Sequence, residues 1–209
     1  MEPMSATITE VEPGELPSRF EPMSHRWAYV EMLISSLLGL GASLVLSIDA
    51  IKIAQNPLVS LSCDISSKIS CTTVGRSEQA SLLGFPNSFL GLIAEPVVIT
   101  IAVAALGGVC FPRWFMLGAQ GVYTIGFVFA YWLFYEAYFV IGALCPWCLL
   151  ITVTTTLVWF SMTRVNIMEG NLGARIQSAL KRPLELGADI ALCVLLVAGF
   201  AAAIIVAYL

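Results

Sequence analysis

GADIALCVLLVAGFAAAIIVAYL, residues 187–209, is the stretch that decides the fold class. Its one charged residue, Asp189, stands near the start, and the remainder is apolar or small apart from Tyr208. A helix needs about 20 predominantly apolar residues to cross a bilayer, so this segment is long enough to span. Four further stretches meet the same requirement: residues 27–51, 88–110, 115–140 and 143–163. The sequence therefore predicts an all-α integral membrane protein with a fifth, C-terminal helix over 185–209.

The composition of the whole chain points the same way. Of its 209 residues, 58% are hydrophobic and 11% are charged, whereas soluble domains carry roughly 25% charged residues. A net charge of −4 argues against a nucleic-acid partner. Residues 1–26 hold four of the ten prolines and five glutamates but no apolar run. We expect them to form a disordered cytoplasmic tail rather than a cleaved signal peptide.

Lysine and arginine predict which side of the membrane each loop faces. With the N-terminus inside, the cytoplasmic stretches hold seven of the ten cations, namely Arg19, Arg26, Arg113, Arg164, Arg175, Lys181 and Arg182. The opposite face holds three, namely Lys52, Lys68 and Arg76. We therefore expect the N-terminus inside and the C-terminus outside. An extracytoplasmic loop then covers 56–87 and a cytoplasmic linker covers 164–184.

In this topology four of the six cysteines collect at the extracytoplasmic face. Cys63 and Cys71 stand eight positions apart in the polar stretch LSCDISSKISC, and Cys145 and Cys148 form the motif CPWC at the start of the fourth span. This is the side on which disulfides persist. A free cysteine otherwise behaves as a small apolar side chain, and we expect that of the remaining two, Cys110 and Cys193.

The CPWC motif has the properties of a redox pair. Cysteines at i and i+3 on the first turn of a helix can form a disulfide or expose a thiolate, which the helix N-terminus favours. Pro146 suits the first turn, where its missing N–H costs nothing. A structural disulfide capping the helix is the alternative. A zinc site is disfavoured, because the Cys63/Cys71 spacing is wide and the one histidine, His25, falls on the cytoplasmic side.

Two separated thiol pairs beside a bilayer suggest a relay. A soluble thiol partner could attack a disulfide in the loop, and electrons could pass to CPWC by thiol–disulfide exchange. The chain carries no haem or flavin fingerprint, so a lipid-embedded acceptor is needed. A quinone fits, because it takes two electrons at membrane depth.

Four motifs occur in order along the chain: Cys63-Asp64-Ile65; Cys71 with Val74 and Ser77; Gly84-Phe85-Pro86-Asn87 with Gly91; and Cys145-Pro146-Trp147-Cys148. This combined set resembles the vitamin K epoxide reductase (VKOR) family, most closely its bacterial, actinobacterial-type members, over residues 27–163. The DsbB family, another quinone-linked membrane oxidase, has its CxxC in the first loop and its wide pair in the second. The order in this chain is the reverse.

The resemblance implies a four-helix bundle around a quinone, menaquinone or ubiquinone, covered by the first outer loop, with no metal. Cys148 would react with the quinone and Cys145 would be its partner. Cys71 would pair with Cys145 in the relay, and Cys63 would exchange with the redox partner outside. The quinone oxygens would be bound by Asn87 and Ser77, which would also help the loop to close.

Several residues allow a second interpretation. Asn87 and Ser77 are both good helix N-caps. The stretch RSEQASLLG, residues 76–84, is expected to form a half-helix that lies on the membrane surface as a lid. Glu95 and Glu136 fall within spans; a proton route for quinone reduction is possible, but we favour interfacial placement or an internal hydrogen bond. Thr152 stands where vertebrate VKOR members have a quinone-contacting tyrosine.

The sequence thus predicts an enzyme of the cell membrane, a quinone-dependent thiol–disulfide oxidoreductase that supports disulfide formation in exported proteins. Many bacterial members continue into a fused thioredoxin-like domain, whereas this chain ends at Leu209. We therefore expect a separate thioredoxin-fold (DsbA-like) protein to supply the electrons. Two alternatives stay open: a non-catalytic scaffold with structural disulfides, and reduction of vitamin K epoxide.

Overall fold

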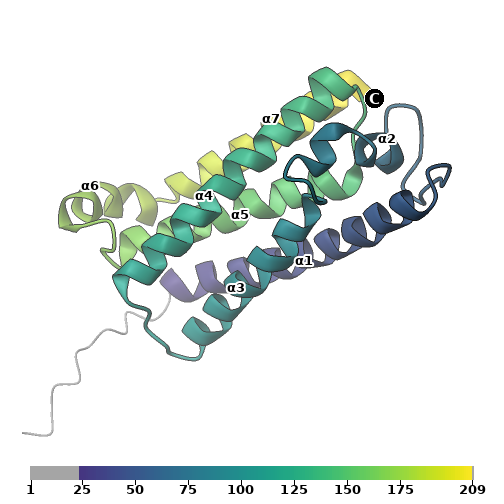
Figure 1. Ribbon diagram of the computed structural model, residues 1–209. Helices are drawn as coiled ribbons and strands as arrows, with labels where there is room; N and C mark the ends of the chain where they lie inside the picture. The colour runs from purple at the N-terminus through teal and green to yellow at the C-terminus, as the bar shows by residue number, and fades with distance from the viewer. Residues whose placement is uncertain (1–23, 209) are drawn as a thin grey trace, which may run out of the picture.

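The computed structural model describes residues 24–208, and most of this range is helical. Five long helices lie lengthwise through the molecule (Figure 1): α1 (Ser24–Gln55), α3 (Ser88–Leu106), α4 (Arg113–Tyr135), α5 (Pro146–Met168) and α7 (Ala188–Tyr208). Four short elements complete the chain: α2 (Cys71–Gly75), the 3₁₀ helix η1 (Glu78–Ser81), the π-helical continuation of α4, η2 (Glu136–Ile141), and α6 (Ala174–Glu185).

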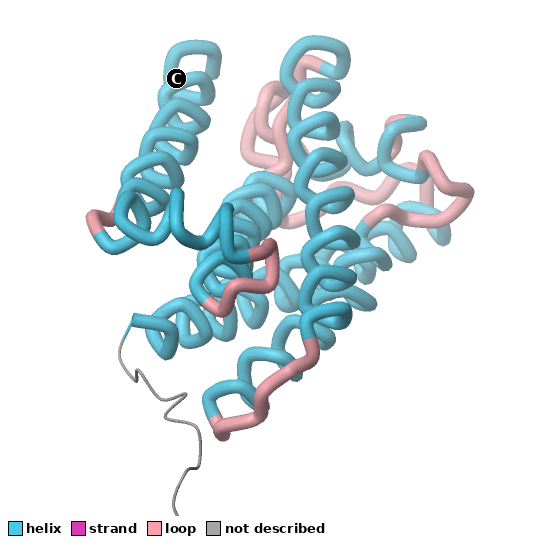
Figure 2. Tube along the Cα trace, turned by 90° about the vertical axis from the view of Figure 1, so that its left-hand side faces the viewer, coloured by secondary structure: helices cyan, strands magenta, loops and turns pink. Residues whose placement is uncertain are grey.

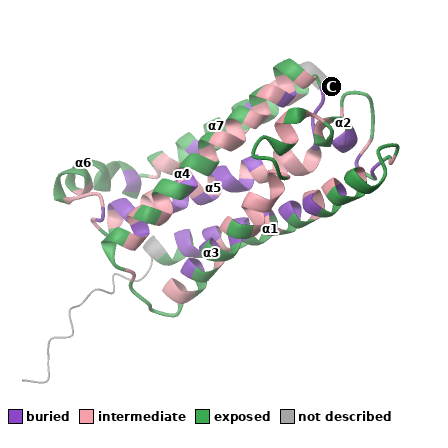
Figure 3. Cartoon of the chain, in the orientation of Figure 1, coloured by how far each residue is buried: buried purple, intermediate pink, exposed green. Residues whose placement is uncertain are grey.

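All five long helices are apolar enough to cross a membrane, and η2 extends the membrane-spanning segment of α4 to Ile141. Large apolar side chains cover their outer faces, as with Ile93, Ile125 and Leu195, which are each about two-thirds exposed or more. Figure 3 shows exposed residues along the outside of the helices and buried ones between them. Apolar outer faces of this kind suit contact with lipid. The predicted class, a multi-pass all-α membrane protein, is confirmed.

The two ends of the bundle differ in what they carry. The start of α1, the α3–α4 connection and α6 lie at one end, whereas α2 and the C-terminus lie at the other (Figure 1). Loops gather at these ends and leave the helical middle uninterrupted (Figure 2). We call the end formed by residues 56–87 and 142–145 the cysteine end. The side of the membrane that it faces stays a prediction from loop charge.

Helices α1 and α3 pack closely because small residues face each other. A Cβ atom on Gly91 would overlap Ser43 Oγ, and one on Gly39 would stand 2.8 Å from Glu95 Oε1. Ser47 Oγ donates a hydrogen bond to the hydroxyl of Ser88, 3.0 Å away, at the cysteine end of the same contact. Small residues at such spacings let membrane helices approach without a bulky side chain between them.

Helix α5 is the most buried of the long helices and lies against α1, α4 and α7. Its threonines add polar atoms to the interior, but their hydroxyls are satisfied locally. Thr152 donates to Cys148 O at 3.0 Å and Thr156 to Thr152 O at 2.7 Å. Because these bonds return to the carbonyl four residues earlier, the hydroxyls of Thr152 and Thr156 are satisfied within α5.

The structure adds detail to the predicted linker and corrects two other expectations. Residues 164–184 contain the end of α5 and α6 up to its last residue but one, and the apolar positions Ile176, Leu180 and Leu184 of α6 recur every four residues. Instead of one half-helix, residues 76–84 form the single turn η1, followed by a turn at Gly84. Cys110 is exposed rather than packed, because α3 ends at Leu106.

Two other expectations have different outcomes. Cys193 is buried, as predicted. Of the disordered tail predicted over residues 1–26, residues 1–23 lie outside the described part of the chain.

Candidate active site

The loop of the cysteine end is fastened to the turn that precedes α5. Ile69 and Leu144 form a parallel backbone bridge. Ser70 N donates to Leu144 O at 3.0 Å, and Leu144 N donates to Lys68 O at 2.9 Å. Since Cys71 follows Ser70 and Cys145 follows Leu144, this bridge sets the two cysteines side by side.

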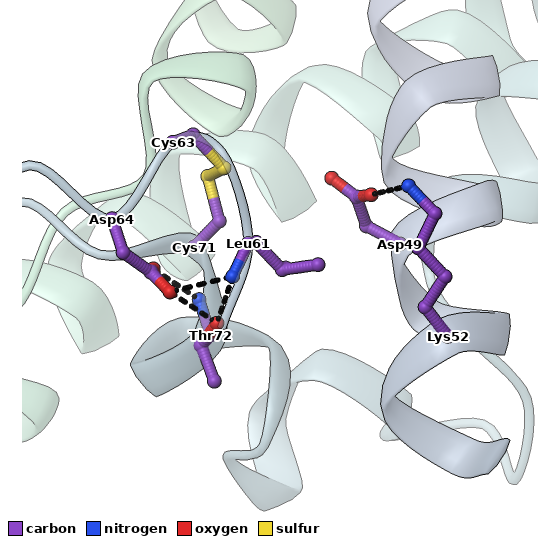
Figure 4. Close-up of polar contacts among 7 residues, drawn as sticks. All are labelled: Asp49, Lys52, Leu61, Cys63, Asp64, Cys71 and Thr72. Atoms are coloured by element: carbon purple, nitrogen blue, oxygen red, sulfur yellow. Dashed lines mark hydrogen bonds and ion pairs between the residues drawn. A yellow bond between two sulfur atoms is a disulfide. The ribbon is translucent and has the colours of Figure 1, made fainter. Parts of the chain in front are cut away.

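The four cysteines of the motifs form two adjoining pairs. Cys63 and Cys71 are joined by a disulfide (Figure 4), whereas Cys145 and Cys148 are free thiols. Cys145 Sγ lies 3.2 Å from Cys71 Sγ, close enough for a hydrogen bond between the sulfurs. Cys145 is 1% exposed and Cys63 is 9% exposed. Both residues are therefore buried in this arrangement of the loop.

Asp64 organises the loop around the disulfide. Its carboxylate accepts hydrogen bonds from Leu61 N at 2.8 Å, Ser70 Oγ at 2.8 Å, and Thr72 N and Oγ1 at 3.0 and 2.6 Å. Figure 4 shows the Asp64 carboxylate joined by hydrogen bonds to Leu61 and Thr72, next to the Cys63–Cys71 disulfide. Partial burial opposes ionisation, but the donors on Thr72, Ser70 and Leu61 outweigh it and lower the pKa of Asp64 far below its usual range. The segments that carry Cys63 and Cys71 are thus held together by more than their S–S bond.

CPWC has the helix-terminal geometry predicted for it. Cys145 is the N-cap residue of α5, in extended conformation, and Pro146 occupies the first helical position. The hydrogen bond from the Cys148 side chain is the main cause that lowers the pKa of Cys145, against the opposing effect of burial. The backbone N–H groups of Cys148 and Trp147 add to this lowering. This lowering favours the thiolate form of Cys145.

A cavity of about 430 Å³ lies beside the free thiols and is lined by residues of α1, α3, α4, α5 and the loop. Cys71, Cys145 and Cys148 all contribute to its wall. Much of the remaining wall is aliphatic or aromatic, including Leu46, Ile53, Leu90, Leu133, Phe134 and Leu149. The volume lies within the range of small-molecule sites, and the apolar wall suits a flat hydrophobic ring.

Asn87 and Ser77 both line this cavity. Asn87 Nδ2 donates to Gln79 O at 2.6 Å, whereas its Oδ1 is buried without a hydrogen-bond partner. Ser77 Oγ donates to Val74 O at 2.7 Å. Both residues stand at helix N-cap positions, but neither side chain makes a capping hydrogen bond. Capping therefore does not account for their place in the wall.

The two membrane acids each accept a hydrogen bond from another element, as the favoured reading predicted. Tyr123 OH donates to Glu95 Oε1 at 3.2 Å, and Gln79 Nε2 donates to Glu136 Oε2 at 3.2 Å. Only Glu95 lines the cavity. Thr152, in place of the vertebrate tyrosine, also lines it.

Seven further polar residues of the cavity wall were not among the predicted site residues: Ser43, Asp49, Gln79, Ser81, Ser88, Tyr123 and Thr155. Asp49 is one of two acids in the predicted span 27–51, the other being Glu31, and an acid within a span is a signal that could have singled it out. Ser43 and Tyr123 have no such signal, because serine and tyrosine are common in membrane helices.

Comparison with known proteins assigns the family. No curated protein matches the chain. The sequence model of the vitamin K epoxide reductase family matches residues 30–163, which include both cysteine pairs and most of the cavity wall. Proteins of this family generally use a quinone or vitamin K as electron carrier. The chain is therefore a multi-pass membrane oxidoreductase that belongs to the vitamin K epoxide reductase family.

Proposed function

We propose that the protein oxidises a thioredoxin-fold protein outside the cytoplasm and passes the electrons to a membrane quinone. The observation that carries this proposal is the 3.2 Å contact between Cys145 Sγ and Cys71 Sγ, with the loop disulfide on one side and the cavity on the other. Exchange between two pairs needs one sulfur of each within reach of the other. Two separate structural disulfides would need no such contact.

The electron path follows from this contact. A partner thiolate attacks Cys63, and the second partner thiol completes reduction of the loop disulfide. Cys71 then attacks Cys145 of an oxidised CPWC pair and releases Cys148. Attack of Cys63 on Cys71 restores the loop disulfide and leaves Cys145 and Cys148 as thiols. This last state is the arrangement in the structure, with the loop pair joined and the CPWC pair free.

The residues of the cavity fit a quinone. The apolar wall would hold the ring, and Asn87 and Ser77 would bind its oxygens. The second N–H of the Asn87 amide would donate to a quinone oxygen, and the unpartnered Asn87 Oδ1 would accept from a hydroxyl of the quinol product. A bound quinone supplies a two-electron, two-proton acceptor for the CPWC dithiol. Cys148 would present its sulfur to the ring, while Cys145, whose pKa is lowered mainly by the Cys148 side chain, would close the new disulfide.

The first experiment follows quinol formation by purified protein with a reduced thioredoxin-fold protein and a quinone. Wild-type protein should form quinol, and Cys148→Ala should form none, because one half of the dithiol is missing. Cys193→Ala is the matched control, since it removes a buried thiol on α7 outside the cavity wall. Absence of quinol with the wild type, or full activity of Cys148→Ala, would refute the proposed function.

A second experiment assigns the entry point. Cys71→Ala leaves Cys63 without the thiol that would resolve a mixed disulfide. With a partner that keeps only its reactive cysteine, this variant should accumulate a mixed disulfide at Cys63 under mild oxidation. Cys63→Ala should not form one, and equal trapping by both variants would refute Cys63 as the entry thiol.

A further inference from the structure

Glu95 is a carboxyl group within the membrane-spanning part of α3, and it is only 3% exposed. The ion pairs among residues 24–208 are Lys52–Asp49 and Arg164–Asp189, and Glu95 takes part in neither. An ionised carboxylate is costly at such a position without a cation. The neutral acid, which carries an O–H donor, is therefore the favoured form.

The hydrogen bonding of Glu95 leaves one oxygen open. Oε1 accepts from Tyr123 OH, but Oε2 is buried and has no partner. Within the described residues, buried side-chain atoms of this kind occur on Ser43, Asn87 and Glu95, and all three residues line the same cavity. Buried polar atoms are usually satisfied, so such a group of unpartnered atoms around one cavity indicates a polar ligand.

Helix geometry places the Glu95 carboxyl well below the thiols. A Cβ atom on Gly39 would lie 2.8 Å from Glu95 Oε1 and 3.1 Å from Thr154 Oγ1, so these two side chains meet at the same level of the bundle. Thr154 follows Cys148 by six residues on α5, which is about 9 Å along the helix. A quinone has its carbonyl oxygens on opposite sides of the ring. With one oxygen beside Cys148, the other points toward the level of Glu95.

We propose that Glu95 is the proton donor to the quinone oxygen that lies farther from Cys148, an inference that rests on the function proposed above. Two electrons leave the Cys145 and Cys148 thiols as their S–S bond forms, and the two thiols release two protons. One of these protons goes to the nearer quinone oxygen and the other leaves to water. Glu95 Oε2 gives its proton to the farther oxygen and regains one from water. The sum is dithiol plus quinone to disulfide plus quinol.

Glu95→Gln tests the role in proton transfer, because glutamine keeps the shape and can still donate and accept hydrogen bonds. We expect kcat for quinol formation to fall about 100-fold, within the usual contribution of a general acid, while KM for quinone changes little. Glu31→Gln is the matched control. It also neutralises an acid of a membrane helix, but Glu31 is bonded to Ser35 and Ser161 and does not line the cavity.

Infrared difference spectroscopy gives a readout that does not depend on turnover. Addition of quinone to the protein should shift the carbonyl stretching band of a protonated carboxylic acid. That band change should vanish in Glu95→Gln and persist in Glu31→Gln. Reduction of the loop disulfide by the partner should be unaltered in both variants.

The outcomes separate the two proposals. If wild-type protein forms no quinol, the proposed function fails. If wild type and Glu31→Gln form quinol and Glu95→Gln matches them in kcat, the proton-donor role is wrong and the function stands. A carboxylic acid band change that survives in Glu95→Gln would overturn the role as well. Were Glu95 only a hydrogen-bond partner of Tyr123, glutamine would replace it without loss.

Discussion

Asp64 and Glu95 are both carboxyl groups beside the same reaction path, but their surroundings are opposite. Asp64, in the loop, accepts hydrogen bonds from Leu61, Ser70 and Thr72 through both of its oxygens. Glu95, in the cavity, accepts one from Tyr123 and has a second oxygen with no partner. The first environment stabilises an anion, and the second favours a neutral acid.

We infer from this difference that Asp64 has a structural role and Glu95 a chemical one. A carboxylate saturated with donors does not readily take up a proton, and it fixes the backbone at Leu61 and Thr72, next to the Cys63–Cys71 disulfide. A carboxyl group with a free oxygen against a cavity can give and regain a proton. The loop acid therefore positions the thiols, and the cavity acid is available to the reaction.

The largest expected effect comes from Gly91→Ala, a substitution in the wall of the cavity. The new Cβ would overlap Ser43 Oγ and stand 2.9 Å from Ser43 Cβ, so α1 and α3 must separate. Overpacking of this kind should lower the free energy of unfolding by about 3 kcal/mol. Thermal unfolding in detergent measures it, with Gly118→Ala as control because a Cβ there meets nothing within 4 Å. The loop disulfide should still form in both variants.

Partial rescue identifies the cause of that loss. Ser43→Gly removes both atoms that the new methyl group would meet, so the double variant should regain much of the stability. If Gly91→Ala unfolds at the same temperature as Gly118→Ala, the close contact of α1 and α3 is not required.

Much of the fold could be predicted, because each span is a long apolar run. The placement of the cysteines followed from the order of the spans. Helix α6 was missed although Ile176, Leu180 and Leu184 carry its apolar period, since a search for long spans passes over a short amphipathic helix. The ends of helices were the other error, as at Leu106.

The fine structure of the site could not be predicted for a physical reason. Tyr123 and Glu95 are 28 residues apart on different helices, and their contact depends on the rotation of α3 and α4 about their axes. Apolar composition does not determine that rotation. The donors of Asp64 come from irregular backbone at Leu61 and from the start of α2 at Ser70 and Thr72, and no sequence period relates these positions.

Asp64→Asn tests how much the loop carboxylate contributes to holding the two cysteine segments together. The amide cannot accept from all of the donors that now meet the carboxylate, so the hold between the two cysteine segments should weaken by about 2 kcal/mol. The equilibrium between the loop disulfide and a glutathione buffer should then shift about 30-fold toward the dithiol. Asp189→Asn is the control, because that carboxylate pairs with Arg164 on α5, away from the loop. An unchanged equilibrium in Asp64→Asn would show that the Asp64 hydrogen bonds do not stabilise the loop disulfide.

The smallest expected effect tests whether Asp64 is ionised in the folded loop. Its pKa in the folded loop is below the usual value, so its contribution is complete at neutral pH and is lost as the pH falls. The loss begins below about pH 4, where the carboxyl of the opened loop gains a proton. The amides of Leu61 and Thr72, which donate to Asp64, should lose hydrogen-exchange protection by up to about tenfold for each further pH unit. The amide of Leu144 donates to a backbone carbonyl, so it should lose less protection than the amides of Leu61 and Thr72. In Asp64→Asn the amides of Leu61, Thr72 and Leu144 should all lose less protection as the pH falls than Leu61 and Thr72 lose in the wild type. Equal losses at Leu61 and Leu144 in the wild type would mean that acid opens the whole loop rather than the Asp64 contacts.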